Sequence, residues 1–388
     1  MKLVYLDHCA TTPIDPRVVE AMMPYYSGEY GNASSIHSYG RKSRRALEES
    51  REQIAQFIGA KYDEVFFTSG GTESDNHAVY GITRARGNNR RSKIVTTAIE
   101  HHAVLDPVES LQSEGIAATY VKVDKDALVS PEDIKRELDD TVSLVSVVHA
   151  NNEVGTIEPV KEIASMCRDR GIVSHTDAVQ SAGKIPVNVQ ELGVDLLSMS
   201  AHKVYGPKGI GIIYIRKGTK IDSFMKGGAQ ESNRRAGTEN VPLAVGFAKA
   251  IEICSQQMEE DNKRILRLKQ LLKTKIGEQF EHILFNGHPT KSLPHVLNVS
   301  FDSTNQQVDG EALIMGLDLH GIAVTSGSAC TSGSLQPSHV LLAMGRDERT
   351  ARATIRFSLG RGTTEEEINY TADALSEVVE QAGAKRKK

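Results

Sequence analysis

Lys203 occupies a position in which a lysine could act as a nucleophile. The apolar run DLLSM (195–199) predicts a buried strand, and Ser200, His202 and Lys203 follow it, ahead of a glycine-proline turn at 206–209. A nucleophilic amine must be partly desolvated so that it loses its proton below its free pKa of ~10.4. Lysine at a strand end also serves plain solubility, so this stretch alone leaves both interpretations open.

Two other predicted strands are followed by residues suited to an anionic and a cationic ligand group. Gly71 and Thr72 open a helix after the run EVFFT, where free N–H groups and the helix dipole favour phosphate. Asp177 and Gln180 follow the run GIVSHT, and the carboxylate could pair with a cationic ligand nitrogen. The alternative in each case is an ordinary helix cap, by Thr72 or Ser69 at the first helix and by Asp177 at the second.

Histidine and amide side chains follow two further strands. His101 and His102 come after KIVTTAIE, where they could be metal ligands, a flat ring that stacks on an aromatic ligand, or simple polar residues. Asn152 comes after VSLVSVVHA, and its amide suits a hydroxyl or carboxylate partner, although a simple loop would also contain it.

The candidate residues named above share one feature that strengthens the case for a common site. Ligands of parallel sheets bind beyond the carboxyl ends of the strands, and all of these residues follow strand ends. Together they place a phosphate cradle, a flat ring, an amide, a carboxylate and a lysine along one sheet edge. Those are the groups that pyridoxal phosphate requires.

The elements that carry these residues alternate between strand and helix from residue 64 onward. Continuous apolar strands between helices predict an α/β fold with a mostly parallel sheet covered by helices on both faces. An amphipathic helix is expected at 38–59, and one or two long helices at 241–280. The expected inner side chains of the long segment are Leu266, Leu268, Leu271 and Leu272.

We expect three parts in the chain. An N-terminal segment (1–15) packs with the small domain, a large domain (16–255) binds the cofactor, and a smaller α+β domain (256–388) completes the chain. The length of 388 residues is sufficient for a large core and two domains.

Composition excludes several classes of partner. The net charge is −4, which gives no reason to expect nucleic acid or an anionic membrane as a partner. The sequence has no apolar run of the ~20 residues that a membrane span needs and no secretion signal at its start. The four cysteines form no CxxC pair, so we expect a cytoplasmic protein without a metal site.

Cys330 lies in the segment SGSACTSGS (326–334), where every neighbour is small or polar. Such a loop cannot bury its thiol, and an exposed thiol in a cytoplasmic protein favours a reactive role over an incidental one. Cys167 and Cys254 lie on predicted helices and are expected to pack. Cys9 lies in a turn beside His8, and there the incidental interpretation is favoured.

At this point the chain resembles the cysteine desulfurases of the NifS/IscS type, which are class V, fold-type I pyridoxal-phosphate enzymes. The resemblance covers nearly the full length. It is carried by these motifs: YLDHCATTP, GNASSIHSYG, FTSGGTESDN, EHHAVL, HANNEVGT, HTDAVQS, SMSAHKVYGPKGIG, RRAGTEN, SGSACTSGS and IRFSLGR.

The resemblance implies how the cofactor is held. Lys203 would form the Schiff base, His101 would stack on the ring and help to move protons, and Asp177 would pair with the pyridinium nitrogen. Gln180 would bond the phenolic oxygen. The residues implied to hold the phosphate are Gly71, Thr72, Ser200, His202 and, across the interface of a homodimer, Thr238.

The resemblance also implies the reaction. Asn152 and Arg356 would bind the carboxylate of L-cysteine, Arg356 as a bidentate clamp. The Cys330 thiolate would take the sulfur as a persulfide, which leaves L-alanine, and a scaffold protein for iron–sulfur clusters or another acceptor would receive the sulfur. His101 or the ligand itself would take the thiol proton.

Three departures from the family pattern affect these expectations. Cys9 stands where a small residue is usual, which places a second thiol near the site. Gly71 stands where many members have alanine, a change expected to matter little. The housekeeping IscS subtype has a longer C-terminal tail for scaffold docking, so the end at Lys388 leans toward a NifS-like or specialised member.

Other functions remain open from sequence alone. Another class V enzyme, such as an aminotransferase or a selenocysteine lyase, would share the cofactor positions, but transamination does not need Cys330. A binding module with a vestigial fold is the non-enzyme alternative. An absorbance band near ~420 nm, the expected sign of the bound cofactor, would argue against that module.

Overall fold

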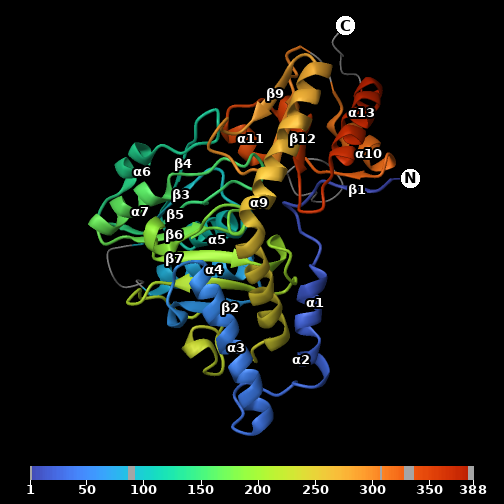
Figure 1. Ribbon diagram of the computed structural model, residues 1–388. Coiled ribbons are helices and arrows are strands. Elements are labelled where there is room, and N and C mark those ends of the chain that lie inside the picture. The colour runs from blue at the N-terminus through green and yellow to red at the C-terminus, as the bar shows by residue number, and fades with distance from the viewer. Residues whose placement is uncertain (1, 86–91, 306–307, 327–335, 383–388) are drawn as a thin grey trace.

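The computed structural model describes residues 2–85, 92–305, 308–326 and 336–382. Its centre is a seven-stranded sheet in the order β2-β8-β7-β6-β5-β3-β4 (Figure 1). The pairs of β3 with β4 and β5, of β5 with β6 and of β6 with β7 are parallel, whereas β8 runs antiparallel to both β7 and β2. The predicted α/β class with a mostly parallel sheet is confirmed.

The sheet and its helices alternate along the chain, as the apolar runs predict. The strands are β2 (Val65–Thr68), β3 (Lys93–Thr97), β4 (Ala118–Val121), β5 (Val142–Ser146), β6 (Val173–Asp177), β7 (Leu196–Ser200) and β8 (Gly211–Ile215). The helices are α1 (Pro16–Met22), α2 (Pro24–Ser27), α3 (Ser38–Phe57), α4 (Gly71–Ala85), α5 (His102–Ser113), α6 (Pro131–Glu137), α7 (Val160–Asp169) and α8 (Val189–Leu192). Three short 3-10 turns are η1 (Tyr62–Glu64), η2 (Ala201–Lys203) and η3 (Glu231–Asn233).

Helices cover both faces of the sheet. Helices α4 and α5 pack on one face, where Val79, Ile82 and Val104 join the buried side chains of the strands. Helices α3, α7 and the first half of α9 (Val241–Gln279) cover the other face, with Ile54 and Ile163 among their buried residues. Burial on both faces explains why the strands read as continuous apolar runs.

The C-terminal part of the chain forms a separate antiparallel sheet. Its order is β12-β10-β9, from β9 (Ile283–Asn286), β10 (Val296–Phe301) and β12 (Thr354–Ser358). The accompanying elements are α10 (Gly310–Leu319), β11 (Ile322–Ala323), α11 (His339–Ala343), α12 (Glu348–Arg352) and α13 (Glu365–Gln381). Strand β1 (Val4–Tyr5) pairs in parallel with β11, so the N-terminal segment contacts this part of the fold.

Two hydrophobic cores support the domain division that the sequence predicts. Ile253 on α9 belongs to the core of the large sheet, whereas Ile265 on the same helix belongs to the core of the small sheet. Helix α9 therefore passes from one core to the other between these residues. We propose the boundary near residue 255 on this ground.

The long segment 241–280 is one helix, and one of its predicted inner residues is wrong. Leu268 and Leu272 are buried and Leu271 packs partly buried against them, but Leu266 is 43% exposed. The buried positions Ile265, Leu268 and Leu272 recur at spacings of three and four, and Leu266 lies about 100° around the helix from Ile265. Apolar character alone did not distinguish it from the buried stripe.

Strands turn polar at the edge of the sheet where β5, β6 and β7 end. Asp177 is the last residue of β6, Ser200 is the last residue of β7, and Lys203 ends the turn η2 that follows. Ser200 pairs with Gly211 of β8, which fixes the start of that turn. In the part of the chain that the structure describes, no helix is both long and apolar enough to span a bilayer.

Candidate active site

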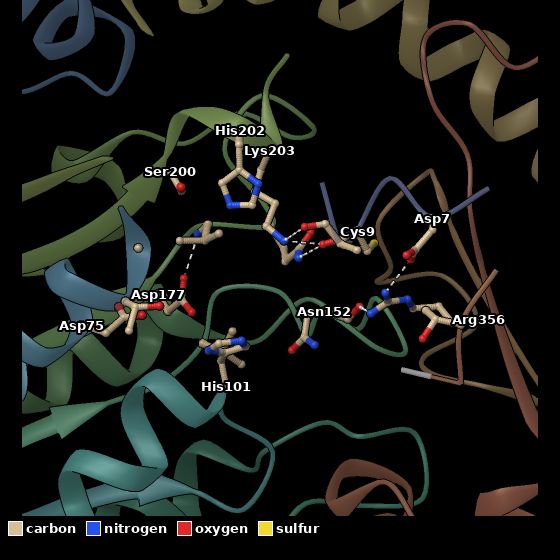
Figure 2. Close-up of a pocket in the computed structure, with 17 residues that line it drawn as sticks. Asp7, Cys9, Asp75, His101, Asn152, Asp177, Ser200, His202, Lys203 and Arg356 are labelled. Carbon is tan, nitrogen blue, oxygen red and sulfur yellow. Dashed lines mark hydrogen bonds and ion pairs between the residues drawn. The ribbon is translucent and has the colours of Figure 1, made fainter. Parts of the chain in front are cut away.

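A cavity of about 400 Å³ opens at this sheet edge, between the large sheet and the small sheet. Ten of the residues that the sequence predicts for the site line it together (Figure 2). They are Gly71, Thr72, His101, Asn152, Asp177, Gln180, Ser200, His202, Lys203 and Arg356. The wall of one cavity thus contains residues more than 280 positions apart in the chain, such as Gly71 and Arg356.

Lys203 projects into the cavity from η2 and is held by backbone carbonyls. Its Nζ donates to the carbonyl oxygen of Ala10 at 2.8 Å and to that of Cys9 (Figure 2). Burial lowers the pKa of Lys203 to about 8. A substantial fraction of the amine is therefore neutral near physiological pH, which is the state a nucleophile needs.

The N-terminus of α4 forms one end of the cavity. Gly71 and Thr72 begin the helix, and Ser200 and His202 face them from the end of β7 and from η2. The first N–H groups of a helix have no partner within the helix, so this end can bind an anion. His202 is oriented by Thr11, whose hydroxyl lies 3.1 Å from its Nδ1.

Gly71 is more constrained than the sequence suggests. A Cβ atom at this position would lie 2.7 Å from Cγ2 of Val179, which also lines the cavity. Alanine would therefore require Val179 to shift, so the exchange expected to matter little carries a steric cost in this chain. Glycine lets the helix start approach Val179 closely.

Asp177, the last residue of β6, lines the cavity. Its Oδ1 accepts a hydrogen bond from the backbone N–H of Val179 at 2.8 Å, and the residue is 6% exposed. Burial raises the pKa of Asp177, and the positive charges of His101 and Lys203 oppose that rise. A cationic ligand nitrogen would stabilise the ionised carboxylate in the same way.

His101 stands at the start of α5 with its ring exposed to the cavity. Its Nδ1 accepts a hydrogen bond from the N–H of Ala103 at 3.0 Å, which fixes the ring as a helix cap. His102 points elsewhere, with Nδ1 2.9 Å from Oδ1 of Asp106. Across the described ranges there is no group of three or more side chains placed to hold a metal ion.

The backbone carbonyl of Cys9 accepts hydrogen bonds from two predicted site residues. Gln180 donates to it from Nε2 at 2.9 Å, and Lys203 donates to the same oxygen. The Cys9 thiol is buried, and its partner is Nε2 of His295 at 3.6 Å rather than the adjacent His8. Cys9 therefore contributes to the site mainly through its backbone.

Arg356 closes the opposite end of the cavity from β12. Its Nη2 forms an ion pair with Oδ1 of Asp7 at 2.9 Å, and its Nη1 donates to the backbone oxygen of Asn152 at 2.9 Å (Figure 2). Its Nε is buried and has no hydrogen-bond partner among the residues described. These two contacts hold the guanidinium and use one N–H of each Nη, so the second N–H of each Nη could serve as the bidentate clamp that the resemblance implies.

Two predicted residues lie outside this cavity. Thr238 is exposed on the loop before α9, and that loop is tied to α4 by an ion pair between Arg235 Nε and Glu73 Oε1 at 2.9 Å. Cys330 lies outside the described residues. Cys167 and Cys254 are buried, in agreement with the packing role expected for them.

Three wall residues with charged or hydroxyl side chains were not predicted as site residues from the sequence: Asp7, Asp75 and Thr325. Asp7 stands in the motif YLDHCATTP, which was the only available signal for it. Asp75 lies inside α4 and belongs to the motif FTSGGTESDN, which was the signal available for it. Thr325 pairs with Arg356 in an isolated antiparallel bridge, and its spacing from other residues carries no signal.

The residues of the cavity fit pyridoxal phosphate. A helix N-terminus with a close-packed glycine suits the phosphate, and a buried carboxylate suits the pyridine nitrogen. Between them lies an amine whose pKa is lowered by burial. Arg356 lines the cavity beyond the amine, and the N–H groups of its Nη atoms that do not contact Asp7 or Asn152 suit a substrate carboxylate.

Comparison with known proteins agrees with this geometry. Residues 4–371 match the family model for class-V aminotransferases, so the chain belongs to that family. The cysteine desulfurase IscS of Dictyoglomus turgidum is 48% identical over 377 residues, which cover 97% of this chain and 94% of that protein. Within the family, the chain belongs to the cysteine desulfurases, which depend on pyridoxal phosphate.

Solved structures show the same fold. A NifS-like protein aligns with a TM-score of 0.90 at 38% identity, covering 98% of this chain and all of that one. A structure described as SspA in complex with cysteine aligns with a TM-score of 0.80 at 32% identity, covering 93% of this chain and 100% of that one. The family that the sequence motifs indicate is confirmed.

Proposed function

We propose that the chain removes sulfur from L-cysteine, releases L-alanine and carries the sulfur as a persulfide on Cys330. The observation that carries the proposal is the arrangement of Lys203, Asp177 and Arg356 around one cavity. Lys203 and Asp177 suit the aldehyde and the ring nitrogen of the cofactor, and Arg356 suits the carboxylate of an amino acid.

The wall residues divide into those that would hold the cofactor and those that would hold the substrate. Gly71, Thr72, Ser200 and His202 would bind the phosphate, and His101 would lie against the ring. Gln180 would turn from the Cys9 carbonyl to bond the phenolic oxygen. Asn152 would join Arg356 at the carboxylate.

Lys203 and Cys330 are the residues expected to act on the substrate. When bound, the cofactor supplies an electron sink for bonds at the substrate α carbon. Lys203 has the position and the lowered pKa to hold the aldehyde covalently and later to carry a proton at Nζ.

The Cys330 thiolate would attack the substrate sulfur, forming the S–S bond as the C–S bond breaks. The electron pair of the broken bond would remain with the carbon, which takes up a proton and leaves as alanine. His101, exposed to the cavity, is the candidate to receive the thiol proton of Cys330. No external oxidant is needed, because the substrate carbon keeps the two electrons that the sulfur loses.

The proposal includes a homodimer, a sulfur acceptor and a cytoplasmic location. Thr238 is exposed and lies outside the cavity, as expected if it reaches the phosphate of a partner subunit in a homodimer. The sulfur would pass to a scaffold protein for iron–sulfur clusters or to another carrier. A cytoplasmic location fits the absence of paired cysteines in the sequence.

The reaction can be tested against the other classes of enzyme. With L-cysteine and excess dithiothreitol, the cofactor-loaded protein should form alanine and sulfide in equal amounts. Dithiothreitol would supply the two electrons and be oxidised to its cyclic disulfide. An aminotransferase would instead need a 2-oxo acid and would consume it, whereas a selenocysteine lyase would release selenide from selenocysteine but little sulfide from cysteine.

The lowered pKa of Lys203 predicts how cofactor uptake depends on pH. Only the neutral amine can add to an aldehyde, so the reactive fraction rises with pH and levels off above about 8. Below that value we expect the rate of recombination with pyridoxal phosphate to rise about tenfold per pH unit. Stopped-flow absorbance would measure it, and a rise that continues to pH ~10 would show an unperturbed amine.

Replacing Arg356 by lysine should weaken substrate binding selectively. The ammonium keeps the charge but cannot reproduce the contacts with Asp7, Asn152 and a carboxylate. We expect KM for L-cysteine to rise by about 10- to 100-fold, the range for losing a hydrogen bond to a charged group. Arg352→Lys on exposed α12 is the matched control, and an unchanged KM in Arg356→Lys would remove Arg356 from the substrate site.

A further inference from the structure

Asp75 is a buried carboxylate in the wall of the cavity to which no role has yet been given. It lies on the second turn of α4, beside Asp177 (Figure 2), and is 1% exposed. Its Oδ1 has no hydrogen-bond partner within the described ranges. The nearest basic group is Nε2 of His175, 3.6 Å from that oxygen, which is too far for a hydrogen bond.

His175 does not balance a negative charge on Asp75. Burial lowers the pKa of His175 to about 3, so its imidazole is neutral. Its two nitrogens contact hydroxyl groups, with Nδ1 2.8 Å from Ser146 Oγ and Nε2 3.1 Å from Ser198 Oγ. The side chain therefore has partners of its own on both sides.

The other ionisable groups that act on Asp75 are also acidic. Asp177 on β6 and Glu100, in the turn after β3, both raise the pKa of Asp75, in addition to the larger effect of its burial. Glu100 is itself fully buried, and burial raises its pKa to about 8. Asp75 thus faces two carboxyl groups and one neutral imidazole.

Asp177 has a different environment, although it is a neighbour. It accepts the N–H of Val179, and the charges of His101 and Lys203 favour its ionised form. Two carboxylates in one buried site do not both ionise easily, and the proton settles on the one with less support. Asp75 is that residue, since its charge is supported only by a hydrogen bond from the Ser198 hydroxyl, whereas Asp177 has the N–H of Val179 and the charge of Lys203.

We propose that Asp75 stays protonated at neutral pH and acts as a positioning residue for Asp177, so that the pair presents a single negative charge to the ring nitrogen of the cofactor. The inference rests on the proposed function in that the pyridine ring is the ligand. One carboxylate charge then matches one protonated nitrogen. A second negative charge would raise the pKa of the ring nitrogen further.

The first test measures the proton on Asp75 directly in cofactor-free protein. Infrared difference spectra at pH 7 between the wild type and Asp75→Asn should show the carbonyl-stretch band of one protonated carboxylic acid in the wild type. The band of Glu100 is present in both proteins and cancels. A difference spectrum that contains only carboxylate bands would overturn the proposal.

The second test measures the charge that the bound cofactor experiences. Asn replaces a neutral acid by a neutral amide of the same shape, so the pH midpoint of the cofactor absorbance should be unchanged in Asp75→Asn. If Asp75 were ionised, the variant would lose a neighbouring negative charge and the midpoint would fall by about one unit or more. Asp75→Ala should bind cofactor about tenfold more weakly through loss of a buried polar contact, and Asn should restore the binding.

Equal weakening in Ala and Asn would mean that the carboxyl group itself is required, which would also overturn the proposal. Neither test uses L-cysteine. If the protein failed to release sulfur from L-cysteine, both measurements on Asp75 could still be interpreted. If Asp75 proved to be charged, the proposed desulfurase reaction would not be affected.

Discussion

Replacing Lys203 by alanine is expected to abolish sulfur release and the covalent attachment of the cofactor. Lys203 lines the cavity, and burial lowers its pKa to about 8. Its Nζ donates to the backbone carbonyl of Cys9. Loss of the proton carrier alone would reduce kcat by about 10²- to 10⁴-fold, and loss of attachment adds to this. The absorbance band near ~420 nm should disappear.

Borohydride reduction followed by peptide mass spectrometry would locate the attachment. In the wild type the peptide that contains Lys203 should gain the mass of the cofactor, and in Lys203→Ala no peptide should gain it. Lys217→Ala is a suitable control, because Lys217 follows β8 and its side chain is 72% exposed. Cofactor found on another lysine of the wild type would contradict the assignment.

Replacing Cys330 by serine is expected to remove sulfur transfer while leaving the cofactor site intact. A serine hydroxyl ionises far less readily than a thiol with its pKa of ~8.5, and it cannot form a persulfide. We expect turnover with L-cysteine to fall by at least about 1000-fold, as is usual when a nucleophile is removed. Cofactor absorbance and its change on addition of L-cysteine should persist.

Cys9→Ser is the matched control for this variant, because Cys9 is a cysteine in the cavity wall. Its thiol is buried against His295, so we expect turnover within about twofold of the wild type. Full activity in Cys330→Ser would refute the proposed nucleophile, and loss of activity in Cys9→Ser alone would transfer the role to Cys9.

The strand ends were predictable because a parallel sheet imposes a simple rule. Buried strands read as apolar runs, so the residues just after each run could be named without a structure, and Asp177 and Lys203 are examples. The family motifs added Arg356, which lies inside β12, and gave a role to Gln180, which lies three residues after the end of β6. The structure then brought all of them into one cavity.

Other features could not be predicted, because they depend on contacts between distant segments. The pairing of Cys9 with His295 joins residues 286 positions apart. Strand β9 was not among the expected elements, because its apolar run is only four residues long and follows closely on the end of the long helix. The protonation of Asp75 depends on the neighbouring charges of Asp177 and Glu100, which the spacing in the sequence does not reveal.

The proposed function depends on the transfer of sulfur from L-cysteine to Cys330. Brief incubation of the cofactor-loaded protein with L-cysteine, followed by mass spectrometry of its peptides and an alanine assay, tests this transfer most directly. We expect the peptide that contains Cys330 to gain one sulfur atom, with one alanine formed for each sulfur bound. Alanine with the sulfur on Cys9 would contradict the proposed acceptor, and the absence of both products in a protein shown to hold its cofactor would contradict the reaction.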